Sequence, residues 1–239
     1  MTRRPIPYRT ESLCPVCLQR IPAEYRQEVP EETVVLHKIC PEHGAFAEPV
    51  WRGEPDFRSW VRDKTPSHPR HPFVETDRGC PFDCGLCSEH GQHTCTGLIE
   101  ITARCNMRCP VCFASAGEHV EPDPSLDHIA FQLDRLKQAS GPCNVQLSGG
   151  EPTVRDDLPE IIRMAKKRGF GLVQCNTNGL RLGTEPGYAA SLRAAGLDSV
   201  YLQCDAADDA AHEVLRGRRC LSEKLAAIRA CAEAGIGVV

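Results

Sequence analysis

Three cysteines in a CxxxCxxC run are the residues of this chain best suited to chemistry. Cys105, Cys109 and Cys112 lie in the run Cys-Asn-Met-Arg-Cys-Pro-Val-Cys. Cysteine thiolates are the usual ligands of iron–sulfur clusters. Three thiolates on a cluster of four irons leave one iron open, and an open coordination position is what a catalytic metal site needs. On spacing alone, a structural zinc site or a closed cluster with a fourth cysteine is the alternative.

A regular alternation of strand and helix patterns follows and must position these cysteines. Strands are predicted at 97–102, 144–148, 171–176, 199–204 and 236–239. Helices are predicted to begin near Ser125, Asp156 or Asp157, Tyr188 and Ser222, the last with Leu225 and Ile228 on its apolar side and Cys231 in the core. Successive βα units imply a parallel sheet with helical crossovers, so the fold class is α/β.

Polar motifs fall where three of these strands end. Ser148-Gly-Gly-Glu-Pro follows the second strand, Asn176-Thr-Asn-Gly ends the third, and Gln203-Cys-Asp ends the fourth. The carboxyl ends of parallel strands share one rim, which carries the active site in (β/α) barrels. A simple glycine or Asn-Gly turn would explain each motif alone. Their coincidence on one rim indicates a binding site next to the CxxxCxxC loop.

A second CxxxCxxC run precedes the first and has a fourth cysteine close by. Its residues are Cys80, Cys84, Cys87 and Cys95. Four thiolates would close a cluster and leave no open iron. We therefore predict an auxiliary [4Fe-4S] cluster that relays electrons or binds substrate. A structural zinc knuckle, with His90 or His93 replacing one ligand, is the alternative.

Two matching turns near the N-terminus predict a third metal site. Cys14-Pro-Val-Cys17 and Cys40-Pro-Glu-His43 each place proline after the first ligand. Three sulfurs and one nitrogen in tetrahedral geometry suit a mononuclear zinc or a rubredoxin-like iron. Such a closed site is structural or transfers electrons. His37 is the reserve candidate for the fourth ligand.

Composition narrows the class of protein. The 239 residues carry a formal net charge of −4, which gives no electrostatic reason for nucleic acid as a main partner. No apolar run is long enough to span a bilayer, and no secretory signal is visible. The 15 cysteines therefore belong in a reducing compartment, where they bind metal or do chemistry. A cytoplasmic location is expected.

Spacing of cysteines and prolines predicts four segments. They are a metal module at 1–47, a proline-rich docked linker at 48–79, an auxiliary-cluster segment at 80–96, and a barrel segment at 97–239. The last predicted strand stops without a following helix, which would leave a sheet edge unpaired. We expect the rest of the barrel to lie beyond Val239 in a longer protein.

The order of these motifs resembles the radical S-adenosylmethionine (SAM) superfamily. CPxC, CPxHG, GCPxDCGxC, CNMRCPVC and SGGEPT follow one another in that order. The resemblance implies a partial (β/α)6 barrel, truncated in strand five, after a small rubredoxin-like or zinc-ribbon-like module. It also implies that Cys105, Cys109 and Cys112 hold a catalytic [4Fe-4S] cluster. Gly149, Gly150 and Glu151 would hold the amino group of SAM, and Thr177, Asn178 and Gln203 its carboxylate or ribose. Cys175 and Cys204 depart from the apolar residues expected there.

Within the superfamily the motifs resemble a branch that includes archaeal tetraether lipid synthases. The same branch is also described as methyltransferases acting on a 7,8-dihydropterin. The resemblance implies an oxygen-sensitive enzyme that cleaves SAM to a 5′-deoxyadenosyl radical and takes electrons from a ferredoxin or flavodoxin. We expect carbon–carbon bond formation between lipid chains, with peripheral membrane contact. Methylation of a dihydropterin is the alternative, and a multi-metal electron-transfer protein is the non-enzyme alternative.

Two features would separate the two substrates. A deep apolar tunnel that reaches the SAM site would favour lipid. A small polar pocket would favour pterin.

Overall fold

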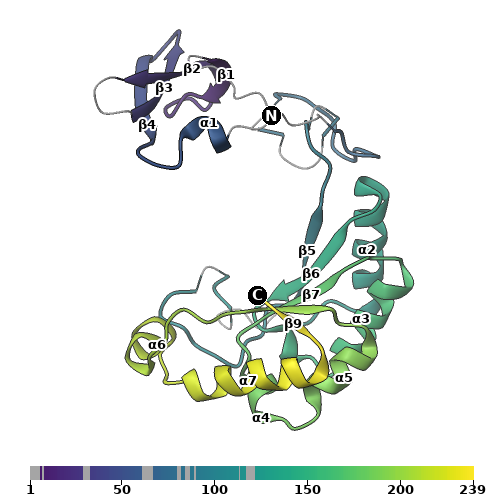
Figure 1. Ribbon diagram of the computed structural model, residues 1–239. Coiled ribbons are helices and arrows are strands. Elements are labelled where there is room, and N and C mark those ends of the chain that lie inside the picture. Colours follow the sequence, from purple (N-terminus) through teal and green to yellow (C-terminus); the bar gives the residue numbers. More distant parts are fainter. Residues whose placement is uncertain are drawn as a thin grey trace. The chain divides into compact units, whose positions relative to one another are not determined.

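The computed structural model describes most of the chain as two compact units. The described residues are 6, 8–28, 33–60, 67–79, 82–83, 87–88, 90–112, 114–116 and 122–239. One unit spans 1–92 and the other 93–239 (Figure 1).

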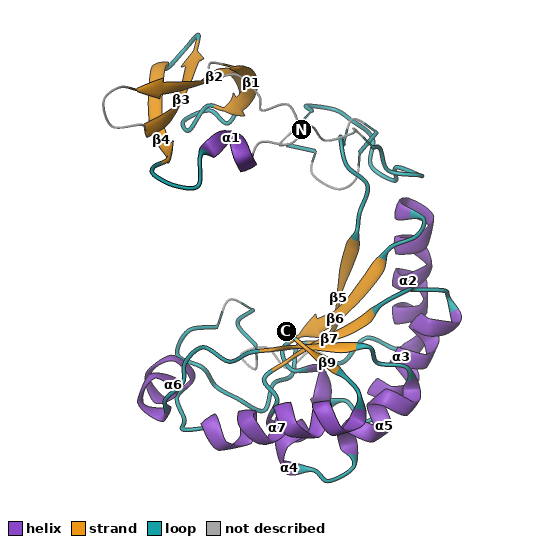
Figure 2. Ribbon diagram, viewed as in Figure 1, coloured by secondary structure: helices purple, strands orange, loops and turns teal. Residues whose placement is uncertain are grey.

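The first unit contains an antiparallel sheet of four strands in sequential order. The strands are β1 (Tyr8–Leu13), β2 (Arg20–Glu28), β3 (Thr33–Cys40) and β4 (Gly44–Trp51), followed by the one-turn helix α1 (Phe57–Trp60) (Figure 2). Strand β4 runs four residues past the boundary predicted at 47. The Phe57 ring lies 5.2 Å from that of Tyr25 and 6.2 Å from that of Trp51. The start of the predicted linker is thus packed against the sheet.

The second unit is built on a parallel sheet of five strands. They are β5 (Thr96–Thr102), β6 (Asn144–Gly149), β7 (Val173–Thr177), β8 (Ser199–Leu202) and β9 (Gly237–Val238), hydrogen-bonded in that order. Between them lie α2 (Leu126–Ser140), the 3-10 turn η1 (Pro152–Val154), α3 (Leu158–Lys167), α4 (Leu180–Thr184), α5 (Tyr188–Ala195), α6 (Asp209–Arg216) and α7 (Leu221–Ala234). The predicted α/β class and parallel sheet are confirmed.

Helices α2, α3, α5 and α7 lie along one face of this sheet, and the apolar core fills the space between (Figure 2). Leu133, Leu147, Ile162 and Leu192 are fully buried there. The predicted cap of α2 is present, because the Ser125 hydroxyl accepts a hydrogen bond from the His128 N–H. Among the described residues, no helix combines the length and the apolar character that crossing a bilayer requires.

The last helix differs from its prediction. Helix α7 begins at Leu221 rather than Ser222, and its buried side chains are Lys224, Ala227 and Cys231. Leu225 is 44% exposed and Ile228 is 36% exposed, so the expected apolar side faces outward. The burial of Cys231 is as predicted. The spacing of apolar residues predicted the wrong buried face, because Lys224 lies on the buried face. Its charge has hydrogen-bond partners there that the sequence does not reveal.

Candidate active site

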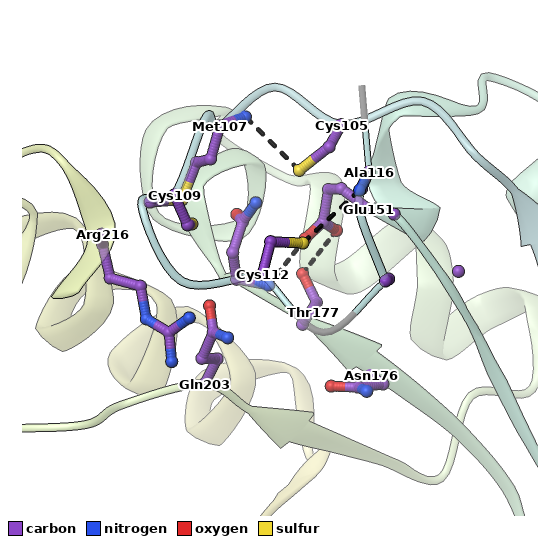
Figure 3. Close-up of a pocket in the computed structure, with 14 residues that line it drawn as sticks. Cys105, Met107, Cys109, Cys112, Ala116, Glu151, Asn176, Thr177, Gln203 and Arg216 are labelled. Atoms are coloured by element: carbon purple, nitrogen blue, oxygen red, sulfur yellow. Dashed lines mark hydrogen bonds between the residues drawn. The ribbon is translucent and has the colours of Figure 1, made fainter. Parts of the chain in front are cut away.

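The loop after β5 brings the three predicted cysteines to the carboxyl ends of the strands. One pocket is lined by Cys105, Met107, Cys109, Cys112, Ala114, Ala116, Gly149, Gly150, Glu151, Asn176, Thr177, Asn178, Gln203 and Arg216 (Figure 3). The pocket contains every residue predicted for the catalytic cluster and for SAM. The pocket lining also includes four residues that were not predicted, Met107, Ala114, Ala116 and Arg216.

The two glycines of the GGE run are required by a close approach of backbones. A Cβ on Gly149 would lie 2.1 Å from the carbonyl oxygen of Thr102, and one on Gly150 would lie 2.3 Å from that of Arg104. Gly149 also has a φ of 128°, which favours glycine. The Gly150 N–H donates to the Thr102 carbonyl at 2.8 Å. These glycines therefore seat the end of β6 against the chain that enters the cysteine loop.

The carboxylate of Glu151 is buried and joins the ends of two strands. Its Oε1 accepts hydrogen bonds from the Thr153 N–H, the Thr153 hydroxyl and the Thr177 hydroxyl, the last at 2.7 Å. Its Oε2 accepts one from the Asn178 N–H at 2.6 Å. A carboxylate has about four lone-pair sites. Donors within the protein thus occupy most of the acceptor sites of this carboxylate, which was predicted to bind the ammonium group of SAM.

The side chain of Asn178 connects β7 to the cysteine loop. Its Nδ2 donates to the Asn106 Oδ1 at 2.8 Å, and its Oδ1 accepts from the Leu180 N–H at 3.0 Å. Asn106 lies inside the CxxxCxxC run, between the first two cysteines. The Asn-Thr-Asn-Gly motif therefore holds the loop in place besides lining the pocket. Asn106 was not predicted, although its polar type within the cysteine run was a signal.

A buried lysine ties the ends of β7 and β8 together. Lys224 of α7 is fully buried. Its ammonium group donates to the carbonyl oxygens of Asn178, at 3.1 Å, and of Gln203. Both acceptors belong to pocket residues, so α7 helps to set the shape of the pocket from behind.

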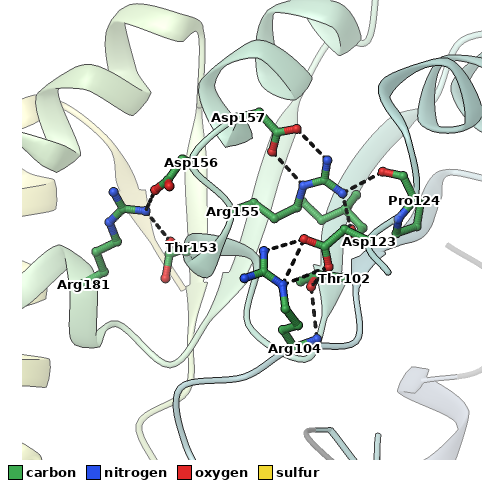
Figure 4. A network of polar contacts seen from close by, with 10 residues as sticks. Thr102, Arg104, Asp123, Pro124, Thr153, Arg155, Asp156, Asp157 and Arg181 are labelled. Atoms are coloured by element: carbon green, nitrogen blue, oxygen red, sulfur yellow. Dashed lines mark hydrogen bonds and ion pairs between the residues drawn. The ribbon is translucent and has the colours of Figure 1, made fainter. Parts of the chain in front are cut away.

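An ion-pair network anchors the entry to the cysteine loop (Figure 4). The Arg104 guanidinium, directly before the first cysteine, holds the pKa of Asp123 below its usual range. Arg155 is only 5% exposed, pairs with Asp157 through two hydrogen bonds, and donates to the Ile101 carbonyl at 2.7 Å. Arg155 likewise lowers the pKa of Asp157. Strand β5 is thereby fixed at the point where the loop begins.

The loop itself suits an iron–sulfur cluster. The Met107 N–H contacts the Cys105 sulfur at 3.4 Å, and the Ala116 N–H contacts the Cys112 sulfur at 3.5 Å. Hydrogen bonds to the ligand sulfurs are one of the means by which proteins tune such clusters. Burial raises the pKa of the Cys105 thiol. Cys105 and Cys109 pack against a small apolar cluster of Met107, Leu180 and Cys220.

The N-terminal motif forms a compact four-ligand cluster. The side-chain ligand atoms of Cys14, Cys17, Cys40 and His43 all lie within 4.8 Å of one another. The Cys17 and Cys40 sulfurs are 3.9 Å apart, and the His43 Nδ1 is 3.5 Å from the Cys40 sulfur. Zn–S bonds of about 2.3 Å in a tetrahedron give an S···S edge of about 3.8 Å. The donor set and its spacing therefore fit a tetrahedral metal, with His43 rather than His37 as fourth ligand.

Two cysteines of the second motif lie outside the described residues, namely Cys80 and Cys84. Cys87 is buried in the first unit, and Cys95 is exposed in the second. The Asp83 carboxylate accepts hydrogen bonds from three successive N–H groups, at 77, 78 and 79, directly before the motif. The auxiliary cluster stays a prediction.

The sequence matches known families over both units. The profile of the radical SAM superfamily matches residues 99–239, and an HMPTM N-terminal zinc ribbon domain matches residues 6–52. The chain belongs to the radical SAM superfamily of enzymes, and this membership implies a [4Fe-4S] cluster and SAM.

Relatives and solved structures agree with this assignment. The chain is 37% identical to the 7,8-dihydro-6-hydroxymethylpterin dimethyltransferase of Methanocaldococcus jannaschii, over 97% of this chain and 46% of that protein. It is 30% identical to a probable GTP 3′,8-cyclase of Methanothermobacter thermautotrophicus, over 63% of this chain and 48% of that protein. The chain thus spans about half the length of these relatives.

Among solved structures, anSMEcpe with bound AdoMet has a TM-score of 0.51 at 20% identity, covering 60% of this chain and 42% of that one. Streptococcus suis SuiB, bound to its precursor peptide SuiA, also has a TM-score of 0.51, at 17% identity, covering 61% of this chain and 32% of that one. At these identities the likeness concerns the fold alone.

Proposed function

We propose that this chain is part of a radical SAM methyltransferase that acts on a 7,8-dihydropterin. The observation that carries the proposal is the 37% identity to the M. jannaschii pterin dimethyltransferase, which runs through the zinc ribbon and the barrel alike. This interpretation replaces lipid coupling, which the motif order had favoured.

The face of the parallel sheet opposite α2, α3, α5 and α7 supports a small polar substrate. Leu98, Gln146, Gln174 and Ser199 form one row across the strands in register, on the side away from the helices. Gln146 donates to Gln174 at 2.6 Å, and Gln174 donates to Ser199 at 3.0 Å.

A second row crosses the sheet nearer to the cysteines. It contains Glu100, Ser148, Asn176 and Tyr201, and Asn176 donates to Ser148 at 3.3 Å. Leu98 is the one aliphatic side chain in the two rows. Such a surface offers amide, hydroxyl and carboxylate groups to a heterocycle rich in N–H and C=O groups, and little to a hydrocarbon chain. This second row borders the pocket, because Asn176 belongs to the row and also lines the pocket.

The residues have separate roles in this proposal. Cys105, Cys109 and Cys112 would hold the catalytic cluster, which supplies one electron for the reductive cleavage of SAM. The amino group of SAM would be held by Gly149, Gly150 and Glu151. Its carboxylate or ribose would be held by Thr177, Asn178 and Gln203. The proposal also includes an auxiliary cluster held by Cys80, Cys84, Cys87 and Cys95. It further includes a ferredoxin-type electron donor in the cytoplasm.

An assay of the full-length protein tests the substrate. We would reconstitute it anaerobically and reduce it in the presence of SAM and 7,8-dihydro-6-hydroxymethylpterin. Mass spectrometry should show pterin with one or two added methyl groups, and none with the Cys112→Ala variant. Cleavage of SAM to 5′-deoxyadenosine that leaves the pterin unmethylated, but couples lipid chains, would restore the lipid interpretation.

A further inference from the structure

One cation in the pocket has no role in the scheme above. Arg216 is the last residue of α6 and lines the pocket together with the three cysteines (Figure 3). Cys109 lines the same pocket, so the guanidinium and the Cys109 side chain border one cavity. The Arg216 Nη1 lies 3.4 Å from the carbonyl oxygen of Val111, within the cysteine loop. The guanidinium therefore contacts the cysteine loop at the Val111 carbonyl and borders the pocket that the three cysteines line.

Neighbouring side chains hold the guanidinium in this position. Asp205 accepts from Arg216 Nε at 2.7 Å and from Nη2 at 2.5 Å, and the side chains of Arg216 and Asp205 are only 15% and 24% exposed. With its amide oxygen turned toward the guanidinium, Gln203 accepts from Nη1 at 3.0 Å. A planar fork that binds a carboxylate on one side can still present N–H groups elsewhere. Arg216 is thus pre-oriented toward the loop.

The backbone of α6 is seated against the loop as well. The helix ends at Gly217, with a φ of 72°. A Cβ there would lie 3.3 Å from the carbonyl oxygen of Arg108 and 3.4 Å from Pro110. A methyl group at this position would therefore fill the space between the end of α6 and the middle of the cysteine loop.

We propose that Arg216 raises the reduction potential of the cluster held by Cys105, Cys109 and Cys112. Reduction adds a negative charge to the cluster. A positive charge held beside the cluster stabilises that added charge, and the charge around a cluster is a recognised determinant of its potential. Arg216 acts through its charge on the cluster that the cysteines hold, and it is a positioning residue. The inference needs the cluster at these cysteines and is independent of which substrate the enzyme methylates.

A redox titration of the full-length, anaerobically reconstituted protein tests this role. Wild type, Arg216→Gln, Arg216→Lys and Arg219→Gln would be followed by EPR, with iron and sulfide content as the measure of an intact cluster. Arg219 is the matched control, because its side chain is 67% exposed and has only long ion-pair contacts, of 3.8 and 4.0 Å.

In Arg216→Gln we expect the ratio of reduced to oxidised cluster at a fixed potential to fall about tenfold, which is about 59 mV for one electron. Arg216→Lys keeps the charge and should shift less in the same direction, and it carries the test if the glutamine variant does not retain its cluster. Arg219→Gln should match wild type.

Two results would overturn the inference. One is an unchanged potential in an Arg216 variant with full cluster content. The other is an unchanged potential with weakened SAM binding, measured by calorimetry, which would assign the guanidinium to SAM instead. A shifted potential in an enzyme that leaves pterins unmethylated would uphold this inference and reject the proposed substrate.

Discussion

Glu151 shows how one buried side chain can organise the pocket. Its carboxylate is 1% exposed and accepts four hydrogen bonds from groups on the turn after β6 and the end of β7. A buried carboxylate is tolerated only when its lone pairs are satisfied. A contact with SAM would explain a glutamate at position 151, but the fold requires this glutamate as well.

The Glu151→Gln variant should lose stability and SAM affinity together. An amide nitrogen cannot accept, so at least one of the four donors loses its partner, at a cost of about 1–3 kcal/mol. Urea unfolding followed by circular dichroism would measure the loss, and anaerobic calorimetry would measure SAM binding. Glu185→Gln, at an exposed ion pair with Arg181, should change stability by less than about 0.5 kcal/mol. Equal stability of Glu151→Gln and wild type would contradict this account.

At the scale of elements, the pocket depends on a close contact between α4 and α7. A Cβ on Gly183 of α4 would lie 2.1 Å from the backbone carbonyl oxygen of Glu223. The next residue of α7 is Lys224, whose ammonium group reaches the ends of β7 and β8. Helix separation therefore determines whether the lysine can reach its acceptors.

We expect Gly183→Ala to destabilise the barrel unit by about 1–3 kcal/mol, because backbone must move to admit the methyl group. Gly171→Ala is the matched control, since the nearest atom to its added Cβ would be 4.0 Å away. Thermal unfolding of both variants would be compared with wild type. A Gly183→Ala variant no less stable than Gly171→Ala would show that the helices separate at little cost.

The ion pairs at the entry to the cysteine loop should make stability depend on pH. Arg104 lowers the pKa of Asp123 from its ordinary 3.8, so the carboxylate is favoured in the folded state. Its contribution is therefore complete above that value and is lost as the pH falls through the lower folded pKa. The stability difference between wild type and Asp123→Asn should be larger at pH 6 than at pH 3 in urea titrations. A difference that stays constant would mean that the pair contributes nothing to folding.

At the scale of the whole molecule, the two units have cores of very different size. Among the described residues, one apolar cluster of the strand unit contains Cys14, Ile21 and Cys40, with Cys17 and Phe46 packed against them, and Ala23, Val34 and Val35 are buried outside it. Three of these residues are themselves the predicted metal ligands. The parallel-sheet unit instead buries a large aliphatic core that contains none of the three cysteines of the CxxxCxxC loop. Small domains of the first kind commonly depend on their metal for folding.

Loss of the N-terminal metal should therefore unfold the strand unit and leave the barrel folded. The test is limited proteolysis of full-length Cys40→Ser, with fragments identified by mass spectrometry and bound metal measured by elemental analysis. The protease should cleave the variant within residues 8–51, where wild type is protected, while residues 126–234 stay protected in both. His37→Ala is the control and should retain the metal. Protection of 8–51 in a metal-free variant would show that the sheet folds without it.

The sequence by itself determined the residue types of the sites and the order of the elements. Regular spacing of cysteines, glycines and apolar residues is a local property, so the CxxxCxxC loop, the GGE turn, the Ser125 cap and the parallel α/β alternation were predictable. Two helices were not predicted: α4 has only five residues, too few to show a period, and α6 buries His212 as its one buried residue and so has no apolar face to recognise. The sequence also did not predict that the side chains of Leu225 and Ile228 are exposed.

Tertiary structure alone decided which side chains support the site. Arg216 and Val111 are 105 residues apart, and Lys224 lies 46 residues from Asn178. Such contacts arise only when the crossovers bring α6 and α7 back to the carboxyl ends of the strands. A buried lysine also reverses the usual rule that the apolar side of a helix faces the core, because backbone carbonyls solvate its charge. Local sequence carries no record of those acceptors.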